Sequence, residues 1–159
     1  MSSFEERPSD ELLAAVERLQ TARSIVEVAE TLRSSARRLI GSDGVALVLR
    51  DGDHCHYVDE DAVGPLWKGQ KFPMAACISG WSMLKRQTVC ISDIFKDKRI
   101  PQDLYADTFV RSLVMTPICN EPPIGALGAY WAREYTATSK EVATVETLAR
   151  AAGAALSKI

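Results

Sequence analysis

Residues 76–131 read ACISGWSMLKRQTVCISDIFKDKRIPQDLYADTFVRSLVMTPICNEPPIGALGAYW, and this stretch decides the fold. It ends in two apolar runs, Ser112–Ile118 and Ile124–Trp131, separated by Asn120-Glu-Pro-Pro123. Prolines favour a turn and would interrupt a strand ladder, so the two runs are predicted to form a β-hairpin. Strands that are almost continuously apolar are usually covered on both faces. We therefore expect helices on one side of the sheet and, on the other, a second layer with room for a pocket.

Shorter signals before this hairpin predict the rest of the sheet. Gly44 to Arg50 is an apolar run, and Asp51-Gly52-Asp53 has the composition of a tight turn into a second strand, His54 to Val58. Thr88 to Ile91 reads as a short strand before an irregular loop, and a helix is expected to begin at Ile78. Helices and strand hairpins in this order predict an α+β domain.

Helices near both ends of the chain are predicted from their apolar period and their caps. The capping residues are Ser9 for the first helix, Ser24 with Glu27 for the second, and Thr138 with Glu141 for the C-terminal helix. Gly41 is placed to end the second helix, because glycine readily adopts the left-handed conformation of a helix C-terminus. The second helix is expected to pack on the sheet.

The C-terminal helix has apolar residues on two sides. One stripe, Val142, Val145, Ala149, Ala152 and Leu156, follows heptad spacing, and the other is Leu148, Ala151, Ala155 and Ile159. Such a helix can cover its own sheet with one side and meet a partner helix with the other. We expect a homodimer with contacts from Leu12, Val16, Leu19, Val145, Ala149, Ala152 and Leu156. Glutamates at Ala149 and Ala152 are then expected to give a monomer with an intact fold; the alternative is that the stripe packs only on its own sheet.

The overall composition is that of one ordinary globular domain. The chain has 159 residues, 47% of them hydrophobic and 25% charged, with a net charge of -2. No basic cluster is dense enough for nucleic acid, and no apolar stretch is long enough to span a membrane, so a cytoplasmic protein is expected. The cysteines Cys55, Cys77, Cys90 and Cys119 are spread out, which predicts neither a disulfide framework nor a zinc site.

The order of these pieces resembles that of GAF domains, and it is most similar in style to the GAF domains of bacterial sensor histidine kinases. The resemblance covers residues 24–156 and rests on Ser79-Gly80-Trp81, Val89 to Asp93, Asp97-Lys-Arg-Ile-Pro101, Ser112-Leu-Val-Met-Thr-Pro117 and Ile124-Gly-Ala-Leu-Gly-Ala-Tyr-Trp131. It implies a PAS-related central antiparallel sheet with the terminal helices on one face. On the other face it implies a cavity roofed by the helix after Ile78 and the loop from Asp93 to Tyr105.

The resemblance also implies a domain organisation and a role. Residues 1–23 would hold an N-terminal dimer or signalling helix, and residues 24–159 the GAF domain with its C-terminal signalling helix. Such a domain binds a small molecule or a partner and relays a conformational signal, here as part of a two-component sensor histidine kinase. The 159 residues contain no kinase catalytic motif, so this chain is not expected to be an enzyme. Two alternatives stay open, a standalone free methionine sulfoxide reductase and a ligand-free structural dimerisation module.

The resemblance argues against several classes of ligand but does not identify one. Residues 104–111 contain neither Cys nor His, which argues against a covalently attached bilin, and residues 133–141 lack the signature of the cyclic-nucleotide members. The reductases would place a cysteine where Ser79 stands, and Cys77 is expected to be a buried, inert residue that points elsewhere. His54 and His56 share one face of a strand but have no third ligand at a fixed spacing, so neither a metal nor haem is expected.

The predicted pocket is lined by aromatic and polar side chains from the roof, the loop and the hairpin. Its candidate residues are Ser79, Trp81, Asp93, Phe95, Tyr105, Phe109, Thr116 and Trp131, and the hairpin adds Tyr130. Asp93 either caps the turn that follows it or accepts a hydrogen bond from the ligand. Because strand side chains alternate, the pocket receives either Leu113, Met115 and Pro117 or Ser112, Val114, Thr116 and Ile118, and the sequence leaves this open.

Overall fold

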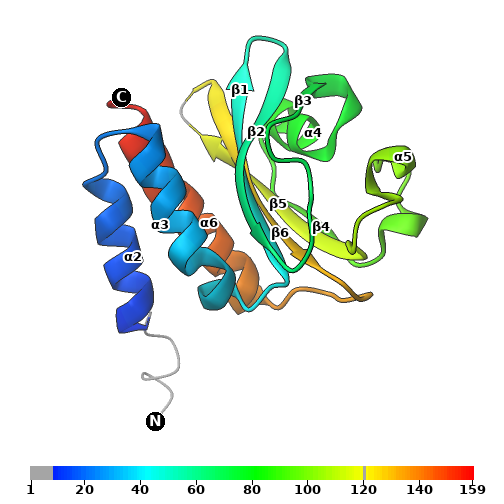
Figure 1. Ribbon diagram of the computed structural model, residues 1–159, viewed down its shortest axis with the longest axis horizontal. Coiled ribbons are helices and arrows are strands. Elements are labelled where there is room, and N and C mark those ends of the chain that lie inside the picture. The colour runs from blue at the N-terminus through cyan, green and yellow to red at the C-terminus, as the bar shows by residue number, and fades with distance from the viewer. Residues whose placement is uncertain (1–8, 120) are drawn as a thin grey trace.

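The computed structural model describes residues 9–119 and 121–159, except for the side chain of Cys119. The strands of these residues form one antiparallel six-stranded sheet in the order β3-β2-β1-β6-β5-β4 (Figure 1). Their bounds are β1 Gly44–Asp51, β2 His54–Ala62, β3 Lys71–Pro73, β4 Val89–Ile91, β5 Ser112–Cys119 and β6 Pro123–Trp131. Both predicted hairpins are present, β1 with β2 and β5 with β6, and the α+β class is confirmed. Asn120, in the second predicted turn, lies outside the described residues.

One face of the sheet is covered by helices from both ends of the chain. Helices α3 (Ile25–Ile40) and α6 (Ser139–Leu156) pack on the strands, and α2 (Asp10–Gln20) packs outside them, at the left of Figure 1. The predicted caps are made: Ser9 Oγ accepts the Leu12 N–H at 3.1 Å, Ser24 Oγ accepts the Glu27 N–H at 3.1 Å, and Thr138 and Glu141 form a reciprocal capping box. Gly41 ends α3 with a φ of 81°.

The chain between β3 and β5 covers the opposite face. It contains the 3-10 turns η1 (Met74–Ala76) and η2 (Ile94–Lys96) and the helices α4 (Ile78–Lys85) and α5 (Gln102–Tyr105). Helix α4 begins at Ile78 as predicted and contacts β2, β5 and β6. The sequence did not reveal β3, η1, η2 or α5, because elements of three or four residues are too short to show a period.

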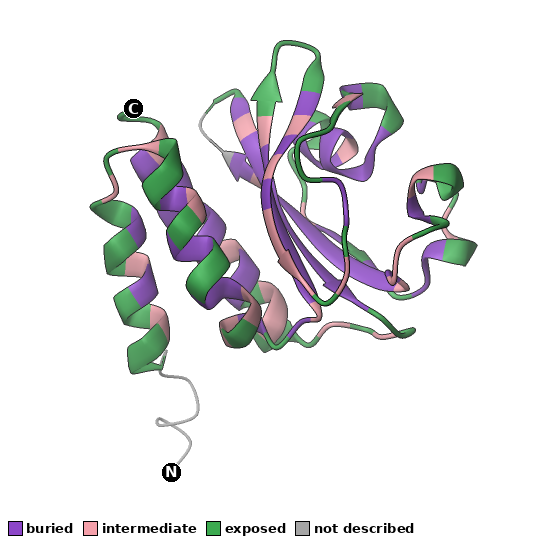
Figure 2. Cartoon of the chain, in the orientation of Figure 1, coloured by how far each residue is buried: buried purple, intermediate pink, exposed green. Residues whose placement is uncertain are grey.

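The two faces of the sheet bury separate hydrophobic clusters, and the strands are buried along most of their length (Figure 2). Leu113 and Met115 of β5 belong to the cluster beneath α4, whereas Val114 and Ile118 belong to the cluster beneath α3 and α6. We call the side of the sheet beneath α4 the roof face, and the side beneath α3 and α6 the helix face. The alternation of β5 therefore directs the Leu113 set toward the predicted pocket.

A β-bulge in β2 decides which of its acidic residues points to which face. Leu47 pairs with Asp59 and Val48 pairs with Tyr57, so Val58 is the extra residue. Strict alternation would place Asp59 on the same face as Tyr57. The bulge shifts this parity by one residue, so Asp59 reaches α3 and Glu60 stays on the roof face.

Most of the apolar residues of α6 are buried inside the protein. Val145, Ala149 and Ala152 are 0%, 2% and 0% exposed, and Leu148, Ala151 and Ala155 are buried in the same cluster. This cluster also contains Ala15 and Leu19 of α2, so the helix that meets the second side of α6 comes from the same chain. Of the predicted dimer contacts, Leu19, Val145, Ala149 and Ala152 are core residues within one chain, and Leu12, Val16 and Leu156 are half-buried against them.

Candidate functional site

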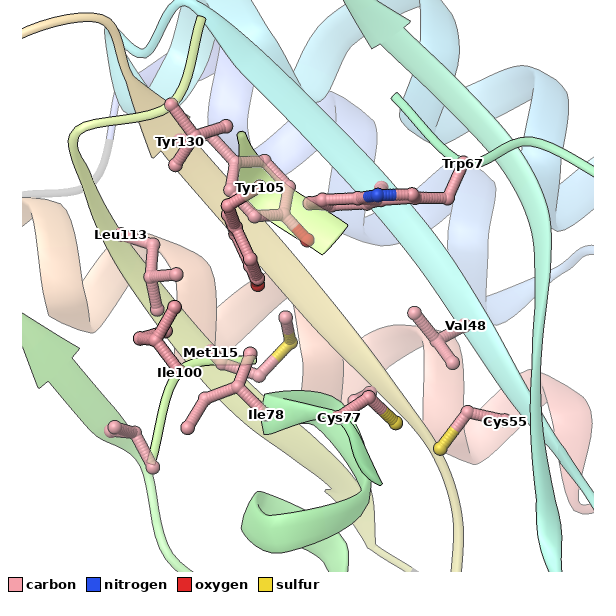
Figure 3. Packing of buried hydrophobic residues seen from close by; sticks show 14 of the residues in the cluster. Val48, Cys55, Trp67, Cys77, Ile78, Ile100, Tyr105, Leu113, Met115 and Tyr130 are labelled. Atoms are coloured by element: carbon pink, nitrogen blue, oxygen red, sulfur yellow. The ribbon is translucent and has the colours of Figure 1, made fainter. Parts of the chain in front are cut away.

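An aromatic cluster lies on the roof face of the sheet, where the sequence predicts a cavity. It consists of Tyr57 on β2, Trp67 in the loop between β2 and β3, Tyr105 on α5 and Tyr130 on β6, and Figure 3 shows three of these rings. The Trp67 ring is 4.8 Å from Tyr105, 5.4 Å from Tyr57 and 5.7 Å from Tyr130 between centroids, in edge-on contacts. Such contacts stabilise aromatic pairs beyond simple burial. Side chains therefore occupy this space, with Trp67 at its centre.

The hydroxyl of Tyr130 is the polar group left over in this cluster. Tyr130 is fully buried, and its oxygen has no hydrogen-bond partner among the described residues. Gly128 makes room for it, since a Cβ at Gly128 would lie 2.6 Å from that oxygen. Burial raises the pKa of Tyr130, so the hydroxyl is neutral and keeps its proton to donate. By contrast, the Tyr57 hydroxyl lies 3.0 Å from Ser79 Oγ and is satisfied.

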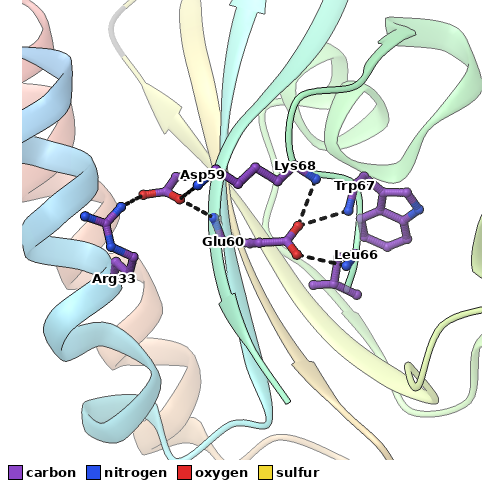
Figure 4. Close-up of polar contacts among 6 residues, drawn as sticks. All are labelled: Arg33, Asp59, Glu60, Leu66, Trp67 and Lys68. Atoms are coloured by element: carbon purple, nitrogen blue, oxygen red, sulfur yellow. Dashed lines mark hydrogen bonds and ion pairs between the residues drawn. The ribbon is translucent and has the colours of Figure 1, made fainter. Parts of the chain in front are cut away.

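Glu60 holds the loop that carries Trp67. Its carboxylate accepts the backbone N–H groups of Leu66, Trp67 and Lys68 at 2.9, 3.0 and 2.9 Å (Figure 4). The Trp67 indole N–H donates to the Leu104 carbonyl at 3.0 Å, which joins this loop to α5. Hydrogen bonds from the backbone of the loop to Glu60 and from the Trp67 indole to Leu104 thus hold the loop over the aromatic cluster.

Asp59 connects the same loop to the helix face. Its buried carboxylate pairs with Arg33 of α3 and, at 3.1 Å, with the Lys68 ammonium (Figure 4). Asp59 and Glu60 are neighbours on β2 and point to opposite faces because of the bulge. A continuous set of polar contacts therefore runs from Trp67 to α3.

A pair of thiols lies beside the aromatic cluster. Cys55 of β2 and Cys77, the residue that precedes α4, have sulfurs that approach each other in Figure 3. Hydrogen bonds from the Cys55 thiol, from Ser79 Oγ at 3.4 Å and from the Gly80 N–H lower the pKa of Cys77 to about 6. The same thiol contact and burial raise the pKa of Cys55. The expectation that Cys77 points away from Ser79 is wrong, although Cys77 is buried as predicted.

The structure brings only part of the predicted pocket together. Ser79, Trp81, Tyr105 and Phe109 pack in or against the roof-face cluster, or hydrogen-bond to it. Trp81 also lies under the Arg99 guanidinium, 4.7 Å from its ring centroid.

The remaining predicted residues lie elsewhere. Trp131 belongs to the helix-face cluster, and Thr116 Oγ1 is 2.8 Å from Thr88 Oγ1, which in turn donates to Glu146 of α6. Strand alternation puts both on the side opposite Tyr130 and Met115. Phe95 is 60% exposed under Arg111, because η2 directs it to the surface. Asp93 caps η2 by accepting the Phe95 N–H at 3.0 Å, which matches the capping alternative.

Sequence reasoning missed Trp67, Tyr57, Glu60 and Cys55. Trp67 lies in a loop that no periodic signal marks, and Glu60 follows a bulge that the apolar pattern does not reveal. A lone tryptophan next to Gly64-Pro65 was the available signal, because a large aromatic residue in a loop usually packs on something.

His54 and His56 do not form part of a metal cluster. Within residues 9–119 and 121–159, no three His, Cys, Asp or Glu side chains are grouped closely enough to hold a metal ion. In the same described ranges, no helix has the length and apolar character needed to cross a membrane.

Known proteins of the same fold have varied roles. The GAF domain of a phosphoenolpyruvate-protein phosphotransferase from Coxiella burnetii is similar at 13% identity, with a TM-score of 0.79 over 92% of this chain and 90% of that one. A free methionine-R-sulfoxide reductase from Neisseria meningitidis reaches 16% identity and 0.72 over 94% and 90%. The GAF-B domain of DevS from Mycobacterium smegmatis reaches 15% and 0.68 over 83% and 92%. At these identities the likeness shows the fold alone.

The family itself is shown by the sequence match. No curated protein is similar enough to suggest a specific activity. The family model described as GAF domain, in contrast, matches residues 22–157, nearly the whole chain. Its match spans α3, the sheet, the roof and α6. The chain therefore belongs to the GAF domain family, whose fold is generally sensory or regulatory.

Proposed function

We propose that this chain is a sensory GAF domain that binds a small, mainly apolar molecule at the aromatic cluster and relays its binding to the terminal helices, as part of a two-component sensor histidine kinase. The observation that carries the proposal is the Tyr130 hydroxyl, buried without a partner among the described residues. Leaving such a group unpaired costs about 1–3 kcal/mol. Functional sites are among the places where proteins retain such a cost.

The surroundings of Tyr130 indicate the class of ligand. Trp67, Tyr105 and Tyr57 offer ring edges and faces, which suit an aromatic molecule with one polar atom aimed at the Tyr130 hydroxyl. The rings fill the space, so the ligand displaces Trp67 when it binds. Because Trp67 is held through its loop, this displacement acts directly on Glu60 and Lys68.

The polar contacts of β2 supply the path to the helices. Movement of Lys68 changes its pairing with Asp59, and Asp59 in turn pairs with Arg33 of α3. A ligand that favours the displaced loop would thereby bias the position of α3. In this proposal, these contacts transmit the effect of ligand binding from the Trp67 loop to α3.

The proposal is tested on protein purified without added ligand. Native mass spectrometry, compared with the denatured mass of the same sample and with its absorbance spectrum, would reveal a retained molecule. The apo protein is then titrated with phenol, the smallest aromatic probe with one hydroxyl, and thermal unfolding is followed. A clean apo mass together with no phenol-dependent rise in Tm would contradict small-molecule binding at this cluster.

Tyr130→Phe is expected to stabilise the free protein and to weaken phenol binding. Removing the unpaired hydroxyl should raise the free energy of unfolding by about 1 kcal/mol, a Tm increase of about 2–4 °C for a protein of this size. Phenol should bind about tenfold more weakly, since one hydrogen bond is lost. Thermal melts with and without phenol measure both effects.

Tyr57→Phe is the matched control for this variant. Its hydroxyl is paired with Ser79, so the same change should lower stability by about 1 kcal/mol. Equal changes in the free energy of unfolding for the two variants would show that the Tyr130 hydroxyl carries no cost of an unpaired group.

Glu60→Gln is expected to loosen the Trp67 loop. The neutral side chain cannot accept three N–H groups as the carboxylate does, so we expect a loss of about 2 kcal/mol. Hydrogen exchange of the Leu66, Trp67 and Lys68 amides should become faster. Asp61→Asn is the control, because its pair with Arg37 at 3.5 Å is partly exposed and should change stability by less than about 0.5 kcal/mol. Unchanged exchange in Glu60→Gln would remove Glu60 from the path.

The proposal includes a homodimer through the terminal helices, although not through the buried stripe of α6. Apolar side chains that α2 and α3 leave exposed are Leu13 at 52%, Ile25 at 41% and Val26 at 65%. These side chains are available to a second copy. Light scattering at high protein concentration tests the dimer, and a monomer there would remove it from the proposal.

A further inference from the structure

The thiols of Cys55 and Cys77 come from distant parts of the chain and meet under the roof. Cys55 lies on β2, where it pairs with Phe72 of β3, and Cys77 lies between η1 and α4. Both are buried, with exposures of 0% and 5%. Their sulfurs lie close to each other in Figure 3, and each thiol shifts the pKa of the other.

The surroundings of Cys77 favour a reactive sulfur. Ser79 Oγ donates to Cys77 Sγ at 3.4 Å, and the backbone N–H of Gly80, in the first turn of α4, also lowers the pKa of Cys77. Donors of this kind and a helix N-terminus stabilise a thiolate. Cys90, on β4, is exposed but lacks such donors, and burial of its sulfur and Glu146 raise its pKa. Cys90 is therefore the more exposed of these two thiols, whereas Cys77 has the surroundings that favour a thiolate.

We infer that Cys55 and Cys77 form a redox-active dithiol that a hydroperoxide converts into a disulfide, with Cys77 as the attacking sulfur and Cys55 as the resolving one. This inference concerns a covalent modification and does not depend on the ligand of the aromatic cluster. It goes beyond the proposed function because it gives the domain a chemical input.

The reaction balances with hydrogen peroxide as the oxidant. The Cys77 thiolate attacks one peroxide oxygen, the O–O bond breaks, and hydroxide leaves and takes a proton from solvent to become water. Cys77 is then a sulfenic acid. The Cys55 thiol attacks the Cys77 sulfur, the S–O bond breaks, and the oxygen leaves as a second water with the Cys55 proton. Two thiols lose two electrons in total, and the peroxide gains them.

The disulfide would tie the roof to the sheet. Cys77 directly precedes α4, and Cys55 is two residues from Tyr57, a wall of the aromatic cluster. A covalent link there would restrict the movement of α4 relative to β2. Oxidation would thus change how the roof opens.

Peptide mapping of the intact protein tests the inference. Fully reduced protein is treated with hydrogen peroxide at pH 6.5, quenched with an alkylating agent and digested, and the peptides are identified by mass. We expect a peptide that links Cys55 with Cys77. It should form about tenfold faster than Cys90 is oxidised, because the greater thiolate fraction of a low-pKa thiol outweighs the lower nucleophilicity of that thiolate. Oxidation of Cys90 while Cys55 and Cys77 both remain alkylated would overturn the inference.

Single variants assign the two roles. Cys55→Ser should leave a sulfenic acid on Cys77 that dimedone traps, whereas Cys77→Ser should leave Cys55 as a free thiol. Cys90→Ser is the control and should form the linked peptide at the wild-type rate. Because the wild-type peptide map needs no variant, poor folding of either variant leaves the test intact. A trapped sulfenic acid on Cys55 in Cys77→Ser would contradict the assigned order.

The pH dependence gives an independent readout. The rate of disulfide formation should level off above about pH 7, because the pKa of Cys77 is lowered to about 6, whereas oxidation of Cys90 should still increase at pH 9. The other titratable or charged groups that face this pair are Tyr57, Tyr105, Tyr130 and Arg50. Burial raises the pKa of each tyrosine, so the three tyrosines stay neutral over this range. A rate that continues to increase at pH 9 would argue against Cys77 as the attacking sulfur.

Discussion

Gly80→Ala is expected to destabilise the protein by about 3 kcal/mol or more, because overpacking against a backbone cannot be relieved by a side-chain rotation. A Cβ at Gly80 would lie 1.9 Å from the Met74 carbonyl oxygen and 2.5 Å from its carbon. Chemical denaturation followed by circular dichroism measures the effect.

Gly64→Ala is the control for this substitution. Its added Cβ would meet only an atom of Phe109, at 3.6 Å, which is an ordinary contact. We expect a change within about 0.5 kcal/mol. Equal stabilities of the Gly80 and Gly64 variants would show that α4 does not pack this closely on η1.

The close approach at Gly80 matters for function because it positions the roof. Cys77 lies between η1 and α4, and Ser79, in the first turn of α4, reaches Tyr57 of β2. A variant that separates α4 from Met74 should therefore also lose the selective oxidation of Cys77. Stability and thiol reactivity are expected to decrease together in Gly80→Ala.

Ala152→Glu is expected to unfold the protein rather than to give a folded monomer. Ala152 is 0% exposed within the helix-face cluster, and a carboxylate there would be desolvated without a partner. Placing such a group in a core costs several kcal/mol, about 3–5 for an unpaired buried charge. Circular dichroism and light scattering of the same sample distinguish loss of fold from loss of a dimer.

Ala154→Glu provides the control on the same helix. Ala154 is exposed, so the same substitution should leave the fold and its thermal stability almost unchanged. A folded, monomeric Ala152→Glu protein beside a dimeric wild type would restore the expectation drawn from the heptad spacing.

Local signals in the sequence were enough to predict most of the fold. Ser9, Ser24 and Thr138 start helices by accepting backbone N–H groups within the next turn, and Gly41 ends one by its own backbone freedom. Both hairpins followed from turn residues between apolar runs. These features depend on residues a few positions apart, which is why one chain read alone contains them.

The facing of the strands was decided only by the tertiary structure. Nearly every residue of β5 and β6 is buried, so burial alone does not distinguish Met115 on the roof face from Thr116 on the helix face. Trp131 and Thr116 were assigned to the pocket for this reason. In β2, one extra residue at the bulge directs Asp59 to α3 and Glu60 to the Trp67 loop.

The sequence by itself determined the α+β class, the helix ends and the hairpins, because short-range hydrogen bonds and side-chain periods encode them. The tertiary structure decided that the stripe of α6 packs on its own sheet and on α2, that Cys55 meets Cys77, and that Tyr130 is left without a partner among the described residues. These contacts join residues far apart in the chain. They depend on how whole elements pack, which no local pattern records.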